Sequence, residues 1–459
     1  TAPHHPRDPG ALLCATAQLG TGLTFCAPPH PPSGTPISTL KELMTTYLAC
    51  LGTRPEIIKM APLHRELQQR GHRVVVLHTG QHEAVAEVLY RFFGMGPDVR
   101  LPPERRSNRL GDLTALLLEG VDRAVSESQP DVVLVQGDTT SALVGALSGY
   151  YNDKPVAHIE AGLRTGTREP FPEEKNRELI ARLAHWHFAP TARTRDNLLR
   201  EGIADARISV VGNTVIDAAR WTQQQLEPST TSVPSALPAG VEAFLGEHAS
   251  QRLLLVTAHR RENWGEPIRN IAMAIGQLLA AHPDLVVVWP LHPNPAVSEA
   301  VEPVIAALPD AMRARVCLTA PVDYPALITL LERCYFTLTD SGGIQEEASA
   351  LARPVLIARD STERQELVEA GGAVLAVDEN LGLVAGHGLL SRCRALEGGA
   401  DWRRKDGSRF VSPAASRYGA FVTRARYRTA FQSGDVATGG GRMVSSRPDI
   451  SPDTRDVKV

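Results

Sequence analysis

The sequence lacks the patterns that mark membrane-spanning, zinc-binding and disulfide-rich proteins. No run of about 18 apolar residues occurs, so no segment resembles a membrane-spanning helix. The chain has six cysteines and no C-x-x-C pair, so neither a zinc site nor a disulfide framework is indicated. The formal net charge of −3 provides no basic field for nucleic acid. We therefore expect a cytoplasmic protein with no metal, no nucleic-acid partner and no membrane partner.

The two ends of the chain differ in composition from the part between them. Residues 1–43 are rich in Pro, His, Gly and Thr without any hydrophobic period, so we expect a disordered extension. Met44 directly precedes the first strand pattern, which suggests that it is the native initiator. After residue 380 the sequence again lacks a regular hydrophobic period, and we expect residues 381–459 to form an atypical, largely disordered tail.

Between these ends, strand patterns alternate with helix patterns. Hydrophobic residues make up 43% and charged residues 22% of the chain, which is typical of a globular protein. The alternation predicts parallel sheets with helices on both faces, and a stretch rich in Gln, Ser and Pro divides it in two. We therefore predict an α/β chain of two Rossmann-like domains, 44–221 and 251–380, joined by a linker at 222–250. The cleft between the domains is the expected ligand site.

Two acidic side chains follow strand patterns in the first domain. Asp138 comes after the apolar run 132–135 and Gly137, and Glu160 directly follows the run 156–159. Ligands of open α/β sheets bind at the carboxyl ends of the strands. If the two strands are neighbours, both carboxylates face one cleft.

A glycine-containing turn leads from a strand to a helix in the second domain. The backbone N–H groups of Gly342 and Gly343, with the Ser341 hydroxyl, would form an anion cradle suited to a diphosphate. Glu347 lies one turn further and could accept hydrogen bonds from ribose hydroxyls. A capped helix whose acids complement its dipole explains the same pattern equally well.

Other polar residues at strand ends and helix starts are less specific. His259 stands with two arginines at a strand end, where such groups bind phosphate, although a solvated charged loop is the alternative. Arg54 lies in the loop after the first strand and is a candidate ligand, whereas spacing alone favours a surface position for Lys59. Gln81 is ambiguous between a strand-end polar group and a helix start. Spacing alone makes a function for Glu173 unlikely, since acidic residues are common at helix starts.

Nine short motifs occur in one order between residues 46 and 377. They are GTRPE (52–56), TGQH (79–82), GDTT (137–140), HIEAGLRT (158–165), PEEKNR (172–177), GNTVID (212–217), HRREN (259–263), DSGGIQEE (340–347) and RDSTER (359–364). Each motif alone is weak, but nine in order are highly specific. The chain closely resembles the bacterial, non-hydrolysing UDP-N-acetylglucosamine 2-epimerases.

The resemblance implies a fold, an activity and a route. The fold is two Rossmann-like domains facing across a cleft, as in GT-B glycosyltransferases. The activity is the reversible conversion of UDP-GlcNAc to UDP-ManNAc without a cofactor, usually in a homodimer, for cell-surface polysaccharide biosynthesis. The family's route eliminates UDP to give 2-acetamidoglucal and then re-adds UDP with protonation on the other face of C2. Such a route needs at least two acid–base groups.

The resemblance also implies roles for individual residues. The catalytic residues would be Asp138, Glu160, Glu173 and His259, the last of them at the leaving diphosphate. The substrate-binding residues would be Arg54, Lys59, Ser341, Gly342, Gly343 and Glu347. A second, activating substrate site would include Gln81 and His292.

Three features depart from the family pattern. Ala258 stands where Gly is usual, and the loop before Pro170 is one residue short. The family's last helical segment, which carries an Asn-Pro-Tyr-Gly-Asp-Gly-like motif and packs on the first domain, has no counterpart after residue 380. Alternative functions are therefore a hydrolysing 2-epimerase, a GT-B glycosyltransferase, or an inactive UDP-sugar-binding protein. UDP binding without turnover would identify the last of these.

Overall fold

The computed structural model describes most of the chain between residues 44 and 383. The described ranges are 44–81, 83–102, 107, 109–226, 237–258, 260, 263–359, 362–378 and 382–383. The expected extension 1–43, nearly all of the expected tail, and His259 lie outside the described residues.

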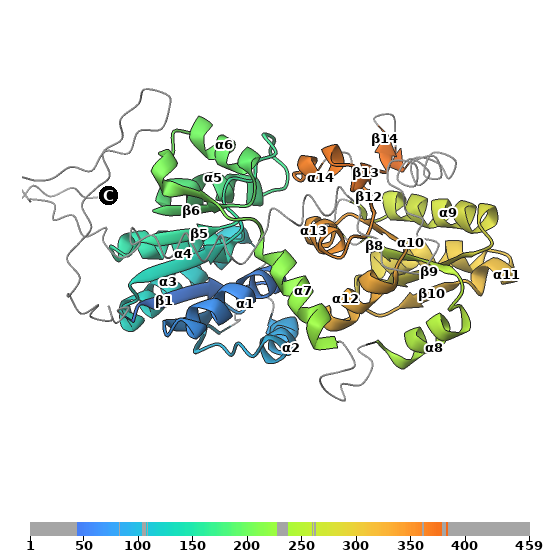
Figure 1. The fold of residues 1–459 in the computed structure, drawn as a ribbon, viewed down its shortest axis with the longest axis horizontal. Coiled ribbons are helices and arrows are strands. Elements are labelled where there is room, and N and C mark those ends of the chain that lie inside the picture. The colour runs from blue at the N-terminus through green and yellow to red at the C-terminus, as the bar shows by residue number, and fades with distance from the viewer. Residues whose placement is uncertain are drawn as a thin grey trace, which may run out of the picture. The chain divides into compact units, whose positions relative to one another are not determined.

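The first sheet has seven parallel strands in the order β3-β2-β1-β4-β5-β6-β7 (Figure 1). They are β1 (Thr46–Leu51), β2 (Arg73–His78), β3 (Val99–Arg100), β4 (Val132–Gln136), β5 (Val156–Ile159), β6 (Trp186–Ala189) and β7 (Ile208–Val210). The strand order reverses between β1 and β4, and ligands of doubly wound sheets bind at this point.

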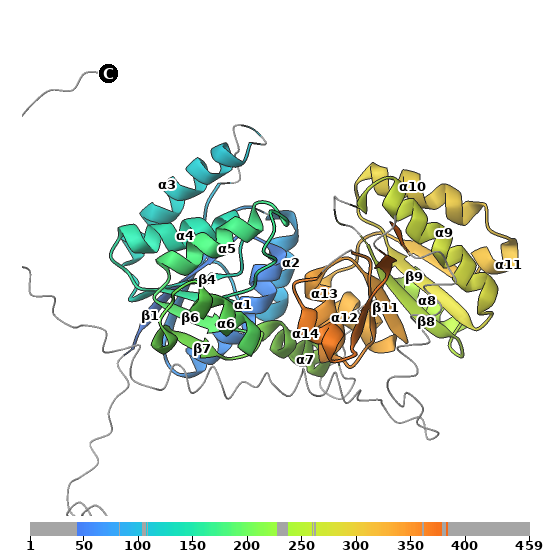
Figure 2. The same ribbon diagram turned by 90° about the horizontal axis from the view of Figure 1, so that it is seen from above.

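Helices cover both faces of this sheet (Figure 2). Successive side chains of each strand point to opposite faces, so each strand has apolar side chains to bury on both sides. Tyr47, Ala49 and Leu51 of β1 belong to one buried cluster, and Leu48 and Cys50 belong to another. The first cluster includes side chains of α1 (Arg54–Gln69), α2 (Glu83–Phe93) and α7 (Thr214–Leu226), and the second includes those of α3 (Leu110–Ser128), α4 (Thr140–Tyr151) and α5 (Glu173–Leu183). Helix α6 (Ala192–Arg200) and the short 3₁₀ helix η1 (Asp205–Arg207) connect β6 to β7.

The second sheet repeats the same topology, with six parallel strands in the order β10-β9-β8-β11-β12-β13. They are β8 (Arg252–Thr257), β9 (Leu285–Pro290), β10 (Val316–Thr319), β11 (Phe336–Thr339), β12 (Val355–Ile357) and β13 (Ala373–Leu375). The helices are α8 (Ala239–Glu247), α9 (Glu266–Ala281), α10 (Pro295–Ala306), α11 (Asp310–Arg313), α12 (Tyr324–Arg333), α13 (Gly342–Ala350) and α14 (Gln365–Glu369). A small antiparallel pair, β14 (Val377–Asp378) and β15 (Gly382–Leu383), follows.

These two sheets confirm the α/β class and the two Rossmann-like halves expected from the sequence. We call the first sheet with its helices the N-lobe and the second the C-lobe. Within 222–250, which we expected to be a linker, the structure contains the end of α7 and all of α8. No helix in the described ranges is long and apolar enough to cross a membrane.

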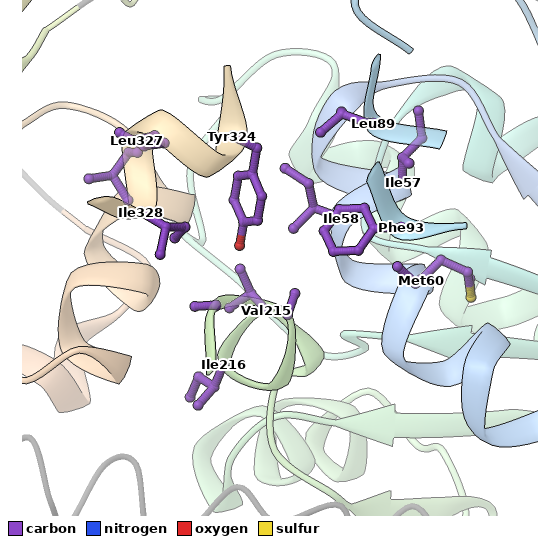
Figure 3. Close-up of a cluster of buried hydrophobic side chains, with 14 of the residues drawn as sticks. Ile57, Ile58, Met60, Leu89, Phe93, Val215, Ile216, Tyr324, Leu327 and Ile328 are labelled. Carbon is purple, nitrogen blue, oxygen red and sulfur yellow. The ribbon is translucent and has the colours of Figure 1, made fainter. Parts of the chain in front are cut away.

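One hydrophobic cluster continues from the N-lobe into the C-lobe (Figure 3). Tyr324 of α12 lies beside Ile58 of α1 and Phe93 of α2 (Figure 3), and Leu327 and Ile328 of the same helix belong to the same cluster. The Tyr324 and Phe93 rings have their centroids 5.7 Å apart. Helix α7 contacts α1 as well as α12 and α13, so the two lobes share a packed apolar junction beside the cleft.

Candidate active site

Asp138 lies at the carboxyl end of β4, where the N-lobe strand order reverses. The chain turns at Gly137, whose φ of +69° is a conformation that glycine adopts without a steric penalty. The Arg177 guanidinium donates from Nε to Oδ2 of Asp138 at 2.7 Å. The Asn176 side-chain amide donates to the Asp138 carbonyl at 2.8 Å. Both the carboxylate and the backbone of Asp138 are therefore held by the start of α5.

Helix α5 begins with two glutamates that have different partners. Glu174 is buried; it accepts from Nη1 of Arg177 at 2.8 Å and from two backbone N–H groups of the preceding loop. Glu173 is half-buried and lines the cleft. Burial first, and then the neighbouring Asp138 carboxylate, raise the pKa of Glu173. Glu173 thus keeps its proton to a higher pH than an ordinary glutamic acid does.

Glu160 follows β5 and has a φ of +66°, which is unusual for a residue other than glycine. Its carboxylate accepts from Nζ of Lys59 at 2.6 and 2.7 Å, from the Asn213 amide at 2.8 Å, and from the Gln136 amide. Burial would raise the pKa of Glu160, but Lys59 and Arg364 outweigh it, and the pKa is lowered. Glu160 is therefore a buried carboxylate held in its ionised form.

The turn after β11 forms the C-lobe wall of the cleft. Ser341 is the N-cap residue of α13, and Ser341, Gly342 and Gly343 all line the cleft. A Cβ atom on Gly342 would lie only 2.4 Å from Nη1 of Arg364, so any larger residue here would have to displace the Arg364 guanidinium. Arg364 also pairs with Glu363 at 2.8 Å.

The other two nucleotide-binding candidates lie away from the cleft surface. Glu347 is buried in α13, and burial raises its pKa to about 7 despite the opposing effect of Arg54 and Lys59. Arg54 is half-buried at the start of α1. Among the described residues that line the cleft, neither Arg54 nor Glu347 is present.

Gln81 and His292 have different surroundings. Gln81 lines the cleft, and its side-chain oxygen accepts from the Ser141 hydroxyl at 2.9 Å. His292 follows β9, packs 5.7 Å from the Trp264 ring, and accepts from the backbone N–H of Asn294 at 3.2 Å. It is not one of the described residues that line the cleft.

Buried polar groups connect the two lobes below the cleft. The Asn213 amide bridges Glu160 at 2.8 Å and Glu346 of α13 at 3.0 Å. Lys59 lies 3.7 Å from Glu346, and Arg364 lies 3.7 Å from Glu160. Two carboxylates and two cations thus form one compensated network, which is the condition for burying charge.

A cleft of about 1030 Å³ lies between the lobes, which is large enough for a nucleotide sugar. Eight of the residues that the sequence singled out line it: Lys59, Gln81, Asp138, Glu160, Glu173, Ser341, Gly342 and Gly343. In the described part of the chain, no group of three or more His, Cys, Asp or Glu side chains is arranged to hold a metal ion.

Sequence reasoning assigned no role to several polar residues at or below the cleft. They are Glu56, Gln136, Asn176, Arg177, Asn213, Glu346 and Arg364. All except Gln136 lie inside the nine motifs. The motifs therefore included these residues, although residue spacing alone did not indicate what their side chains do. Glu56 is an example, because it joins the β1 and β4 loops by accepting from Thr53 N–H and the Thr139 hydroxyl, each at 2.7 Å.

Comparison with known proteins places the chain in a family. The model of the UDP-N-acetylglucosamine 2-epimerase family matches residues 65–389. The chain belongs to this epimerase family. The UDP-N-acetylglucosamine 2-epimerase of Yersinia pestis is 43% identical over 336 residues, which cover 73% of this chain and 87% of the relative. The enzyme of that name from Escherichia coli K12 is 41% identical over 326 residues, 71% of this chain and 84% of the relative.

Solved structures of epimerases share the fold. The Neisseria meningitidis UDP-GlcNAc 2-epimerase, bound to UDP-GlcNAc, has a TM-score of 0.68 and 34% identity, covering 83% of this chain and 95% of that one. The Methanocaldococcus jannaschii epimerase in complex with UDP-GlcNAc and UDP has a TM-score of 0.64 and 29% identity, covering 84% and 99%. These GT-B-like epimerases confirm the fold that the motifs implied.

Proposed function

We propose that this protein interconverts UDP-GlcNAc and UDP-ManNAc by eliminating and re-adding UDP. The observation that carries the proposal is the placement of two carboxyl groups, Asp138 and Glu173, in the same cleft as the cradle Ser341-Gly342-Gly343. Epimerisation at C2 requires one group to accept a proton and another to deliver one. Membership of the epimerase family supports the choice of substrate.

Elimination makes the C2 proton removable. The N-acetyl group at C2 cannot delocalise a carbanion, so a simple deprotonation has no stabilised product. In elimination, the C2–H electron pair forms a C1=C2 double bond while the C1–O bond breaks and its pair leaves on UDP. In re-addition, a UDP oxygen attacks C1 and C2 takes a proton on its opposite face. Atoms and electrons balance without an oxidant or reductant.

We propose that Asp138 and Glu173 are the proton-transfer pair. The guanidinium of Arg177 donates to Oδ2 of Asp138 and fixes the position of this carboxyl group in the cleft, which suits a base. The raised pKa of Glu173 favours its protonated form, which suits an acid. After one forward turnover Asp138 carries a proton and Glu173 has lost one, so the two groups have exchanged roles and are set for the reverse reaction.

We propose a different role for Glu160, although the family resemblance places it with the catalytic residues. Its oxygens already accept from Lys59, Gln136 and Asn213, so neither is free to take a proton from C2. Its lowered pKa also keeps it ionised, so it carries no proton to deliver to C2. Glu160 and Lys59 would instead hold the two lobes in the arrangement that encloses the substrate.

The C-lobe would bind the nucleotide. The N–H groups at the start of α13 and the Ser341 hydroxyl would hold the diphosphate, since helix N-termini bind anions. Glu347 and Arg54 would contact the ribose or the nucleotide after small movements, because both lie behind the cleft surface. His259 would protonate or bind the departing diphosphate, as the resemblance implies.

We also propose that the enzyme acts as a homodimer in the cytoplasm, as the resemblance implies. The described cysteines Cys50, Cys317 and Cys334 are free thiols, which fits a reducing compartment. Tyr150 and Tyr151 at the end of α4 are 59% and 63% exposed and supply apolar surface for a second copy. Light scattering of the full chain would show a dimer, and a monomer at working concentration would contradict it.

Incubation of the purified protein with UDP-GlcNAc tests the proposed activity. Proton NMR should show UDP-ManNAc accumulating to an equilibrium mixture that is also reached from UDP-ManNAc. Free ManNAc together with UDP would instead identify a hydrolysing 2-epimerase. Bound UDP-GlcNAc with no product would identify a sugar-nucleotide-binding protein.

A further inference from the structure

A buried imidazole contacts the turn that carries Asp138. His158 lies on β5, is fully buried, and its Nε2 is 2.8 Å from the carbonyl oxygen of Gly137. The Gly137 N–H donates to the carbonyl of Ile159 at 3.0 Å, so β5 holds both the N–H and the carbonyl of Gly137. Together with the bond from Asn176 to the Asp138 carbonyl, two consecutive carbonyls of the turn are anchored by side chains.

The hydrogen-bonding state of His158 follows from its surroundings. Burial, only partly offset by the Gly137 contact, lowers the pKa of His158 to about 4, so the ring is neutral at pH 7. A neutral imidazole has one N–H, and a carbonyl can only accept. The proton therefore lies on Nε2 and is donated to Gly137. Among the described residues, Nδ1 of His158 has no hydrogen-bond partner.

We propose that His158 is a positioning residue for the epimerisation, holding the Gly137 carbonyl and thereby the carboxylate of Asp138. The proposal rests on the proposed function, because it assigns His158 the task of placing the proposed base. His158 lies behind the turn and is not one of the described residues that line the cleft. It acts through Asp138 and does not touch the substrate.

Conformational freedom at Gly137 makes such an anchor necessary. Glycine has access to more of backbone space than any other residue, and Gly137 is used at φ +69° to turn the chain out of β4. Without the imidazole, the peptide between Gly137 and Asp138 could rotate. A displacement of about 1 Å at a reacting group can reduce the rate about 100-fold.

Two substitutions separate this role from simple core packing. The side-chain nitrogen of Gln can occupy the position of Nε2 in His, whereas that of Asn matches Nδ1. His158→Gln should keep kcat within about threefold of wild type, and His158→Asn should lower kcat about 100-fold with little change in KM. His64→Asn, at a buried histidine of α1, is the matched control and should leave kcat unchanged.

The outcomes separate failure of this proposal from failure of the proposed function. Asp138→Asn is measured in parallel: if it retains full activity, the role of Asp138 is wrong. If Asp138→Asn is inactive while His158→Asn matches wild type, only the positioning role of His158 is wrong. Equal losses in His158→Gln and His158→Asn would show that the ring serves packing alone.

A measurement on the unmodified protein covers the case in which His158→Asn does not fold. Nitrogen-15 NMR of histidine-labelled enzyme, with His158 assigned by its absence from His158→Gln, reports which ring nitrogen carries the proton. The proposal requires the Nε2–H tautomer between pH 6 and 8. Protonation on Nδ1, or a doubly protonated ring, would overturn it.

Discussion

The ammonium nitrogen of Lys59 lies 2.6 and 2.7 Å from the two carboxylate oxygens of Glu160. Both side chains are nearly inaccessible to solvent. Glu160 also lies beside Gly137, because a Cβ atom on Gly137 would be 3.6 Å from its Oε2. The pair is therefore buried directly next to the turn that carries Asp138.

Substitution of Lys59 by Met should destabilise the protein by about 3 kcal/mol, because it leaves the Glu160 carboxylate buried with fewer partners. Glu160→Gln combined with Lys59→Met should recover part of this loss, since no unpaired charge remains. Urea unfolding of the two single variants and the double variant measures the coupling. Strictly additive free energies of unfolding would show that the two side chains do not act as a pair.

The pH dependence of kcat should follow the state of Glu173. Because burial and Asp138 raise its pKa, the proton donor persists above the pH at which ordinary glutamic acid ionises, and kcat should fall as pH rises through this pKa. Asp138→Asn removes the neighbouring negative charge and should lower the pKa of Glu173. Carbon-13 NMR titration of Glu173 measures this shift. An unchanged or higher pKa in Asp138→Asn would contradict the pairing of the two carboxyls.

Gly342→Ala should destabilise the C-lobe and weaken UDP binding. The added methyl would lie 2.4 Å from Nη1 of Arg364 and force the buried guanidinium away from Glu363 and Glu346. Gly343→Ala is the matched control for stability, since its methyl would meet only the Ser341 oxygen at 4.0 Å. Thermal unfolding should show a lower Tm for Gly342→Ala alone. Equal decreases in Tm in both variants would mean that the contact with Arg364 is not the reason why alanine is unfavourable at position 342.

An exposed set of contacts also joins the lobes, at α6 and α14. Arg193 pairs with Glu369 at 2.6 Å and contacts Gln365, and the Thr191 hydroxyl donates to Glu366 at 2.7 Å. Arg195, on the same helix and similarly exposed, pairs instead with Asp205 of its own lobe at 2.8 Å.

Arg193→Ala should weaken the affinity for UDP about threefold, because an exposed ion pair between the lobes stabilises their closed arrangement by at most about 1 kcal/mol. The affinity of the variant should also depend less on salt concentration, because salt screens exposed ion pairs. Arg195→Ala removes an equivalent charge without removing a contact between lobes and should leave the affinity unchanged. Calorimetric titration with UDP at low and high salt compares the variants. If both substitutions changed the affinity equally, the general loss of positive charge would explain the effect.

The strands and helices could be predicted from the sequence because their signals are local. The apolar run at 132–135 lies in β4 (Val132–Gln136), and the run at 156–159 forms β5 (Val156–Ile159). The edge position of Asp138 and Glu160 followed from the same rule, since β4 and β5 are adjacent parallel strands. Each of these inferences needed only hydrophobic periodicity and the topology of parallel sheets.

The environment of Lys59 could not be predicted, because its partners are distant in sequence. Spacing favoured a surface lysine, but the structure buries Lys59 against Glu160, 101 residues away, and near Glu346 of the other lobe. The left-handed backbone of Glu160 is likewise fixed by tertiary contacts and not by its neighbours in the chain. The role of His292 at an activating site stays a prediction from the family resemblance; the structure places its ring 5.7 Å from that of Trp264.

The most direct test of the central claim is proton NMR of the reaction with UDP-GlcNAc in heavy water. Cleavage of the C2–H bond by a carboxylate, with proton delivery from a second one, predicts UDP-ManNAc that carries deuterium at C2. Asp138→Asn and Glu173→Gln should abolish this incorporation. UDP-ManNAc that retains its original proton at C2 would contradict the elimination route and the proton-transfer pair together.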